Sequence, residues 1–332
     1  MTASETIAAT VLAFDEATFA DAPHSRIGDR VGALADTGFV GIAINAPATQ
    51  PEPGDVPIAV AVRHDGARGW DMPLDRNALL VAEHLSTGRV RLGKPFGRVD
   101  AHGPKRHHGE APLDRGPRPP DEQLEGMHSD VAWSGTRRAG LKVAPGDWRF
   151  TILWFDWRSN DVRTRIAGEV EGRLPPPVFP EPHGEGRVPS FLPQGDPLPP
   201  DHDGSLRLLV QEGEDGRQQA LARAVVRGAV KPWMLARGTL VDGGEARAYG
   251  AVVPLHVILM ERNRRSHVFR LGVPVYGQDV AAGEQVTIHA TLDLVAGSDY
   301  LLPPGDYAAH LVSPWGLYGT QRLSVETGGA NP

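Results

Sequence analysis

The sequence contains no cysteine among its 332 residues. This absence excludes disulfide bonds, thiolate zinc sites, iron–sulfur clusters and cysteine nucleophiles. A bound metal ion would therefore need histidine and carboxylate ligands, and the chain has 13 histidines and 41 Asp and Glu residues.

Long apolar segments are also lacking. No run of about 18 apolar residues occurs, and the N-terminal segment combines neither a basic stretch nor an unbroken apolar stretch. We therefore expect a soluble, cytoplasmic protein that does not bind a membrane. The formal net charge of −7 and the pI of about 6.0 argue against nucleic acid as a partner.

Glycine and proline are abundant, at 39 and 30 residues. Because these residues interrupt helices and strands, their frequency disfavours long helices and favours many short strands joined by turns. The sequence therefore predicts an all-β protein. At about 100 to 200 residues per domain, the chain is long enough for two domains.

One segment divides the chain by its composition. Residues 174–203 contain ten prolines and show no regular apolar pattern, which is typical of a stiff, extended linker. We predict the following organisation: a first β-sandwich domain over residues 1–173, a Pro-rich linker over 174–204, a second β-sandwich domain over 205–326, and a tail over 327–332.

The two halves share landmarks in the same order. Each contains a Pro-Gly-Asp turn followed by an aromatic residue, at residues 145–148 and 304–307. A histidine precedes this turn in each half, His128 or His289, and a Gly-x-Pro element lies farther upstream. We infer a tandem repeat, in which the halves are diverged copies of one domain. Two roles are open for each histidine. It can form a cross-strand hydrogen bond, or it can act as a metal ligand or a catalytic base.

Alternating apolar and polar residues predict strands in both halves. The clearest pattern covers residues 286–294, where every second residue is apolar and one face of the strand is polar. Residues 148–154 and 206–210 follow similar patterns, and residues 56–62 form an apolar strand segment. Residues 218–226 fit a strand or a short helix.

The Pro-Gly-Asp-Tyr turn at 304–307, which precedes a late strand and the final hairpin, resembles the corner of immunoglobulin-like and fibronectin type III-like β-sandwiches. The resemblance covers residues 252–325 and implies tandem antiparallel β-sandwich domains. In those folds a tyrosine hydroxyl ties the turn to nearby backbone. The chain departs from immunoglobulin domains because it lacks a cysteine pair and has Trp148 in the first copy. The resemblance concerns architecture and implies no function.

The first half also carries an insertion. Its Gly-x-Pro element and its Pro-Gly-Asp turn are 50 residues apart, against 30 in the second half, and the surplus is a His- and Pro-rich loop over residues 97–127. His102, His107, His108 and Glu110 in this loop are side chains of the types that bind divalent transition metals. They are the candidate metal ligands. The alternatives are a solvated polar loop and a site that binds a partner without metal.

A second candidate site lies after the first Pro-Gly-Asp turn. Trp154, Asp156, Trp157 and Arg158 combine aromatic side chains with one charge of each sign just before a polar turn. Such a set is typical of a ligand-binding platform with a charged clamp, or of an apolar corner that encloses an ion pair.

The common catalytic signatures are missing from the sequence: the nucleophile elbow, the dinucleotide fingerprint, the phosphate loop and the His-Glu-x-x-His motif. We therefore predict a non-catalytic binding or accessory protein whose partner is a protein or other ligand. One alternative is a metal-dependent hydrolase or oxidase that uses the histidine-rich loop. Another is a structural protomer of an assembly such as a homo-oligomer, because paired sandwiches expose edge strands.

Overall fold

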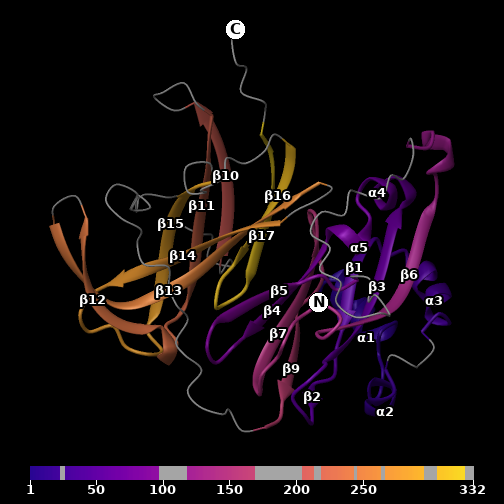
Figure 1. The fold of residues 1–332 in the computed structure, drawn as a ribbon, viewed down its shortest axis with the longest axis horizontal. Helices are drawn as coiled ribbons and strands as arrows, with labels where there is room; N and C mark the ends of the chain where they lie inside the picture. The colour runs from indigo at the N-terminus through magenta and orange to yellow at the C-terminus, as the bar shows by residue number, and fades with distance from the viewer. Residues whose placement is uncertain are drawn as a thin grey trace. The chain divides into compact units, whose positions relative to one another are not determined.

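A computed structural model of the chain describes residues 1–22, 27–96, 118–168, 204–212, 218–242, 245–262, 266–294 and 305–325. The described residues form mainly antiparallel β-sheet, which confirms the predicted predominance of strands. The chain divides into two compact units, Met1–Leu85 with Arg89–Gly172 and Ser86–Gly88 with Arg173–Pro332. Figure 1 shows the elements of both, and each unit is described by itself.

The first unit contains two sheets. Its strands are β1 (Gly41–Asn45), β2 (Thr49–Gln50), β3 (Pro57–Asp65), β4 (Ala78–His84), β5 (Arg89–Gly93), β6 (Met127–Gly135), β7 (Gly146–Trp154), β8 (Trp157–Arg158) and β9 (Val162–Ile166). One sheet has the order β1-β3-β6, and the other has the order β2-β9-β7-β4-β5 with β8 paired to β7. Among these pairings only β2 with β9 is parallel.

The two sheets of this unit pack face to face around an apolar core. Ile58 and Val60 of β3 and Leu80 of β4 are at most 1% exposed within it. The core face of β7 carries the alternating set expected from the sequence: Trp148, Phe150, Ile152 and Trp154. This arrangement is compatible with a β-sandwich.

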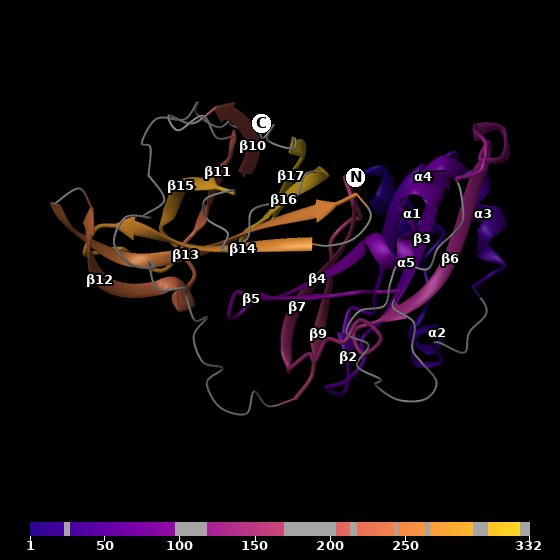
Figure 2. The same cartoon turned by 45° about the horizontal axis from the view of Figure 1, so that its top comes forward.

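Short helices cover the opposite face of the β1-β3-β6 sheet (Figure 2), and the sequence patterns did not predict them. They are α1 (Ala3–Thr10), α2 (Glu16–Ala20) and α3 (Arg30–Asp36), while α4 (Gly66–Asp71) and α5 (Leu74–Asn77) connect β3 to β4. A capping box fixes the start of α1, because Thr2 and Glu5 each accept the other's backbone N–H. No helix in the described part of the chain is long and apolar enough to cross a membrane.

The second unit also contains two sheets. Its strands are β10 (Gly204–Glu212), β11 (Gln218–Ala229), β12 (Leu235–Asp242), β13 (Glu245–Glu261), β14 (Ser266–Tyr276), β15 (Gln285–Asp293), β16 (Gly305–Val312) and β17 (Leu317–Val325), and a short 3-10 turn, η2 (Pro232–Met234), precedes β12. One sheet has the order β10-β11-β15, and the other has the order β12-β13-β16-β17 with β14 paired to β13. The segment over 218–226 is therefore a strand.

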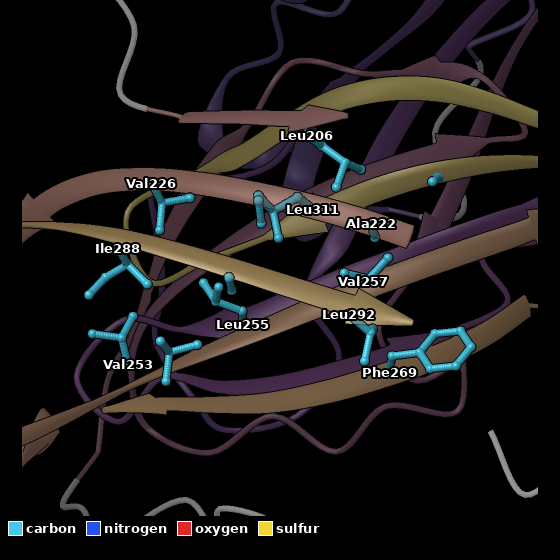
Figure 3. Close-up of a cluster of buried hydrophobic side chains, with 14 of the residues drawn as sticks. Leu206, Ala222, Val226, Val253, Leu255, Val257, Phe269, Ile288, Leu292 and Leu311 are labelled. Atoms are coloured by element: carbon cyan, nitrogen blue, oxygen red, sulfur yellow. The ribbon is translucent and has the colours of Figure 1, made fainter. Parts of the chain in front are cut away.

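A single core fills the space between these two sheets. Figure 3 shows Ala222 and Val226 of β11 and Ile288 of β15 near Leu255 of β13 and Leu311 of β16. The pattern predicted for β15 is confirmed, because Ile288 is 4% exposed whereas its neighbour on the opposite face, Thr287, is exposed. This unit is likewise compatible with a β-sandwich.

The two units share one strand order. When β2, β8 and β12 are set aside, the strands of each unit number seven among the described residues. In each unit the first, second and fifth strands form one sheet, β1-β3-β6 or β10-β11-β15. The other sheet contains the fourth, third, sixth and seventh strands in that spatial order, which gives β5-β4-β7-β9 or β14-β13-β16-β17.

The aromatic residue after each Pro-Gly-Asp turn is buried. Trp148 donates its indole N–H to the carbonyl oxygen of Ala144 at 2.7 Å, so an indole ties this turn to nearby backbone where a hydroxyl was expected. Tyr307 occupies the matching place in the second unit and is fully buried. Burial, with a smaller effect of the nearby Glu261 carboxylate, raises the pKa of Tyr307 to about 12.

Candidate functional site

The four candidate metal ligands His102, His107, His108 and Glu110 lie outside the described residues, so the metal site stays a prediction. Within the described ranges, no group of three or more His, Asp or Glu side chains is placed to hold a metal ion.

The second candidate site is the turn that joins β7 to β8. Phe155 has a φ of 52°, a left-handed conformation that costs a bulky residue roughly 1–2 kcal/mol and that two-residue hairpin turns require. This turn carries Asp156 to Arg68 of α4, and their Oδ1 and Nη2 atoms are 2.5 Å apart. Arg158, the other charged residue of this candidate site, has its Nη2 atom 3.4 Å from Oδ1 of Asp161.

Aromatic rings enclose the same guanidinium. The Arg68 Cζ atom lies 3.7 Å from the centre of the Trp157 ring and 5.0 Å from that of Trp154. The Trp154 indole also donates to the carbonyl oxygen of Met72 at 2.8 Å. The structure therefore brings Trp154, Asp156 and Trp157 together around a cation of the same unit. A ligand-binding role for this corner remains a prediction.

The first unit has a groove of about 1380 Å³ on its surface. It lies between α2, the segment around β2, and the ends of the β1-β3-β6 sheet where β3 begins and β6 stops. Its lining includes Glu16, Phe19, Pro47, Gln50, Pro51, Asp55, Trp133, Ser134, Arg137, Arg138 and Ala167. None of these residues was a candidate in the sequence.

Asp55 fixes the charged end of the groove. Its Oδ1 accepts the backbone N–H of Arg137 at 2.7 Å and the hydroxyl of Thr136 at 3.2 Å. Thr136 in turn accepts the backbone N–H of Val56 at 2.9 Å. Because β3 begins just after Asp55 and β6 ends just before Thr136, these bonds lock the two strand ends together. They fix the backbone at Arg137, whose side chain is exposed, while the Arg138 guanidinium donates to the carbonyl oxygen of Trp133 at 3.3 Å.

The apolar wall of the groove is a cluster of aromatic rings. The ring of Trp133 lies 5.1 Å from Phe14 and 5.6 Å from Phe19, measured between centroids. Trp133 and Phe19 are only 7% and 8% exposed, so little of either ring is open to the groove. This aromatic wall lies next to Arg137 and Arg138 in the lining.

The groove adjoins Pro95, at the end of the described segment 27–96. The hydroxyl of Ser134, which lines the groove, donates to the carbonyl oxygen of Pro95 at 2.6 Å. Pro95 lies two residues before the predicted loop.

Chemically, the groove combines two guanidinium groups, two carboxylates and prolines beside an aromatic wall. No ionisable lining residue is positioned as a paired nucleophile and base; the carboxylate of Asp55 is occupied by Thr136 and by backbone. The arrangement can therefore bind a polar, elongated ligand. No protein family model matches this sequence, and no curated protein is significantly similar to it.

Proposed function

We propose that this protein is a non-catalytic binding module made of two tandem immunoglobulin-like sandwiches. The common strand order of the two units supports a duplication, and so does the buried aromatic residue that follows each Pro-Gly-Asp turn. Seven strands in two antiparallel sheets are also the strand number of constant-type immunoglobulin domains, although here the fourth strand pairs with the third instead of joining the sheet of the first, second and fifth strands.

The observation that carries the binding function is the groove of the first unit. Pockets for small ligands measure about 300–1,000 Å³, whereas this groove has about 1380 Å³. Its size and mixed charge fit an extended peptide segment of a partner protein. Arg137 and Arg138 would bind carbonyl or carboxylate oxygens of that segment, and the prolines and aromatic edges would contact its apolar side chains.

A peptide-display experiment tests this function. A random peptide library is panned on the wild-type protein and on the variant Arg137→Glu/Arg138→Glu, with Lys142→Glu/Arg163→Glu as a control of equal charge change. We expect peptides enriched on the wild type to bind the groove variant at least tenfold more weakly, because truncating charged contacts costs about 1.4 kcal/mol or more. They should bind the control within about twofold.

Two outcomes would contradict the proposal. One is that no peptide family is enriched on the wild type. The other is that the enriched peptides bind the groove variant and the control equally well, which would place their site elsewhere.

A further inference from the structure

Strand β6 forms one edge of the β1-β3-β6 sheet (Figure 1), and its register with β3 is regular over nine residues. Just beyond the strand ends, the N–H of Gly66 donates to the carbonyl oxygen of Gly126, and that of Thr136 donates to the carbonyl oxygen of Val56. Because antiparallel pairs alternate between hydrogen-bonded and non-hydrogen-bonded, the even-numbered residues of β6 are the ones that bond to β3. The backbone N–H and C=O groups of its odd-numbered residues therefore point to the free edge.

Only the later part of this edge is occupied by the chain itself. There the Arg138 guanidinium donates to the carbonyl oxygen of Trp133 at 3.3 Å. Three outward residues earlier in the strand have backbone groups that form no hydrogen bond with another described residue: Met127, Ser129 and Val131. We call residues 127–131 the β6 edge.

Two other edges of the first unit are protected against further pairing. In β1, at the opposite side of the same sheet, the Asn160 side chain binds both the N–H and the C=O of Ile44 at 2.9 Å. In the other sheet, the edge strand β5 carries Arg89 and Arg91, and side chains of one charge discourage pairing with a second strand. The β6 edge has no such protection, so it can accept a further strand.

The side chains of the β6 edge are complementary to a second copy of themselves. His128 and Asp130 are exposed on one face, and Met127 is 44% exposed on the other. A second copy can pair antiparallel with this edge so that the two Ser129 residues lie opposite each other. In this register each His128 lies opposite an Asp130, in a non-hydrogen-bonded pair whose side chains approach closely. Each exposed Met127 likewise lies opposite a Val131.

Other registers lack this match. A shift by two residues in one direction places the two Asp130 carboxylates opposite each other, and like charges directly opposite are unfavourable. The same shift in the other direction places the two His128 rings opposite each other. A shift by one residue no longer brings the outward backbone groups of the two strands together. The sequence of this edge therefore selects the register centred on Ser129.

We propose that two copies of the protein associate through the β6 edge, with a two-fold axis at Ser129. The pairing forms about six backbone hydrogen bonds and joins two three-stranded sheets into one. His128, which the sequence alone left with two open roles, then forms a cross-strand hydrogen bond to Asp130 of the second copy. The inference goes beyond the peptide groove and does not depend on it, because the groove lining on β6 begins at Trp133.

The dimer is weak. Stable, specific interfaces bury about 1,200–2,000 Å² in total, and a pairing over residues 127–131 alone is a small contact. We therefore expect a dissociation constant between about 1 µM and 1 mM.

Sedimentation equilibrium of the full-length protein from about 10 µM to 1 mM tests the proposal. The variant Ser129→Pro removes an N–H that points to the free edge, and no bond to β3 is lost. Its matched control is Ser129→Ala, which removes the hydroxyl and keeps the N–H. Because the two-fold axis doubles the loss, Ser129→Pro should weaken dimerisation by about tenfold or more. Ser129→Ala should stay within about twofold of the wild type.

Exchanging the two charged positions separates pairing between copies from a structural role. Asp130→Lys places a lysine opposite His128 of the second copy and should weaken the dimer by about fivefold. The double variant His128→Asp/Asp130→Lys restores opposite charges across the two-fold axis. Its dissociation constant should return to within about twofold of that of the wild type. A role of either side chain within one copy predicts no such recovery.

Three outcomes overturn the proposal. The first is a wild type that stays monomeric over the whole concentration range. The second is Ser129→Pro that keeps its Tm and dimerises as tightly as Ser129→Ala. The third is a double variant that remains as weak as Asp130→Lys. If the proline lowers the Tm, the charge-exchange series alone decides.

Discussion

Single buried side chains hold the strand ends of the first unit in place. Asn160 accepts the backbone N–H of Ile44 and donates to its carbonyl oxygen, both at 2.9 Å, so its amide takes the place of a neighbouring strand. Glu83 and Arg149 form a buried ion pair at directly paired positions of β4 and β7. Removing one partner of such a pair leaves an uncompensated charge, which is why buried polar groups occur in satisfied sets.

His256 of β13 gives the second unit a pH dependence. Burial, with a smaller effect of Arg270 on the neighbouring strand, lowers the pKa of His256 from 6.5 to about 4. The unfolded chain therefore takes up a proton between about pH 6.5 and pH 4 that the folded chain does not. The stability that His256 contributes is complete above this window and is lost as the pH falls through it.

We expect the variant His256→Gln to lose part of this dependence. The contribution of His256 to the fall in unfolding free energy between pH 7 and pH 4 is about 2–3 kcal/mol, and the variant should be less pH-dependent by that amount. Urea titrations of both proteins at several pH values measure it. An unchanged slope in the variant would show that His256 is solvated in the folded state.

At the scale of elements, α4 packs unusually closely on the sheet beneath it. A Cβ atom added to Gly69 would overlap Cε1 of His64, and one added to Gly66 would overlap the carbonyl oxygen of Leu124 and lie 3.1 Å from Nε2 of His128. The His64 ring has little room to move, because it contacts Trp154 and its Nδ1 lies 2.6 Å from the carbonyl oxygen of Asp65. Both glycines therefore permit the approach of this helix.

Substituting glycines in two helices should give opposite results. Gly69→Ala should destabilise the protein by about 1–3 kcal/mol, because His64 cannot yield without losing its packing. Gly32→Ala in α3 meets nothing within 4 Å and should stabilise it by about 0.5–1 kcal/mol through helix propensity. Chemical denaturation of the two variants measures both values, and a stabilising Gly69→Ala would refute the close packing.

At the scale of the whole molecule, the two units have the same strand order but differ in the face of the three-stranded sheet that is turned away from the sandwich core. In the first unit β3 is buried on both faces, since Ala59 and Ala61 contact the helical layer while Ile58 and Val60 contact the core. In the second unit the equivalent strand β11 is buried on one face, and its other face carries exposed charge.

Hydrogen exchange should reveal this difference. We compare the amide exchange rate of β3 with that of β7 in the first unit, and the rate of β11 with that of β16 in the second. We expect the ratio of β3 to β7 to be about tenfold lower than the ratio of β11 to β16. The ratio within each unit corrects for its overall stability. Mass spectrometry of peptides that cover these four strands measures it, and equal ratios would contradict a protective role of the helices.

Local patterns were sufficient for much of the fold. The strands β3, β10 and β15 and the turns before β7 and β16 follow from alternation and from Pro-Gly-Asp, because side chains on a strand alternate between two environments. The N-terminal helices were missed because they are short and weakly amphipathic. They are stable mainly through their packing on the β1-β3-β6 sheet, which no local pattern records.

The candidate sites depended more on tertiary structure. One of the two readings of the Trp154–Arg158 corner was an enclosed ion pair, but the cation that Asp156 meets is Arg68 from a distant part of the chain. Likewise, the groove joins Asp55 to Arg137, and no pattern of spacing predicts such a pair.

The sequence by itself determined the β-rich class, several strands and the order of landmarks in the two halves, because these depend on local backbone preference and on the period of side-chain burial. Only the tertiary structure decided which charges meet, which sheet face is covered, and where a groove opens. Those features arise from contacts between residues far apart in the chain, and the pairing of the strands sets them.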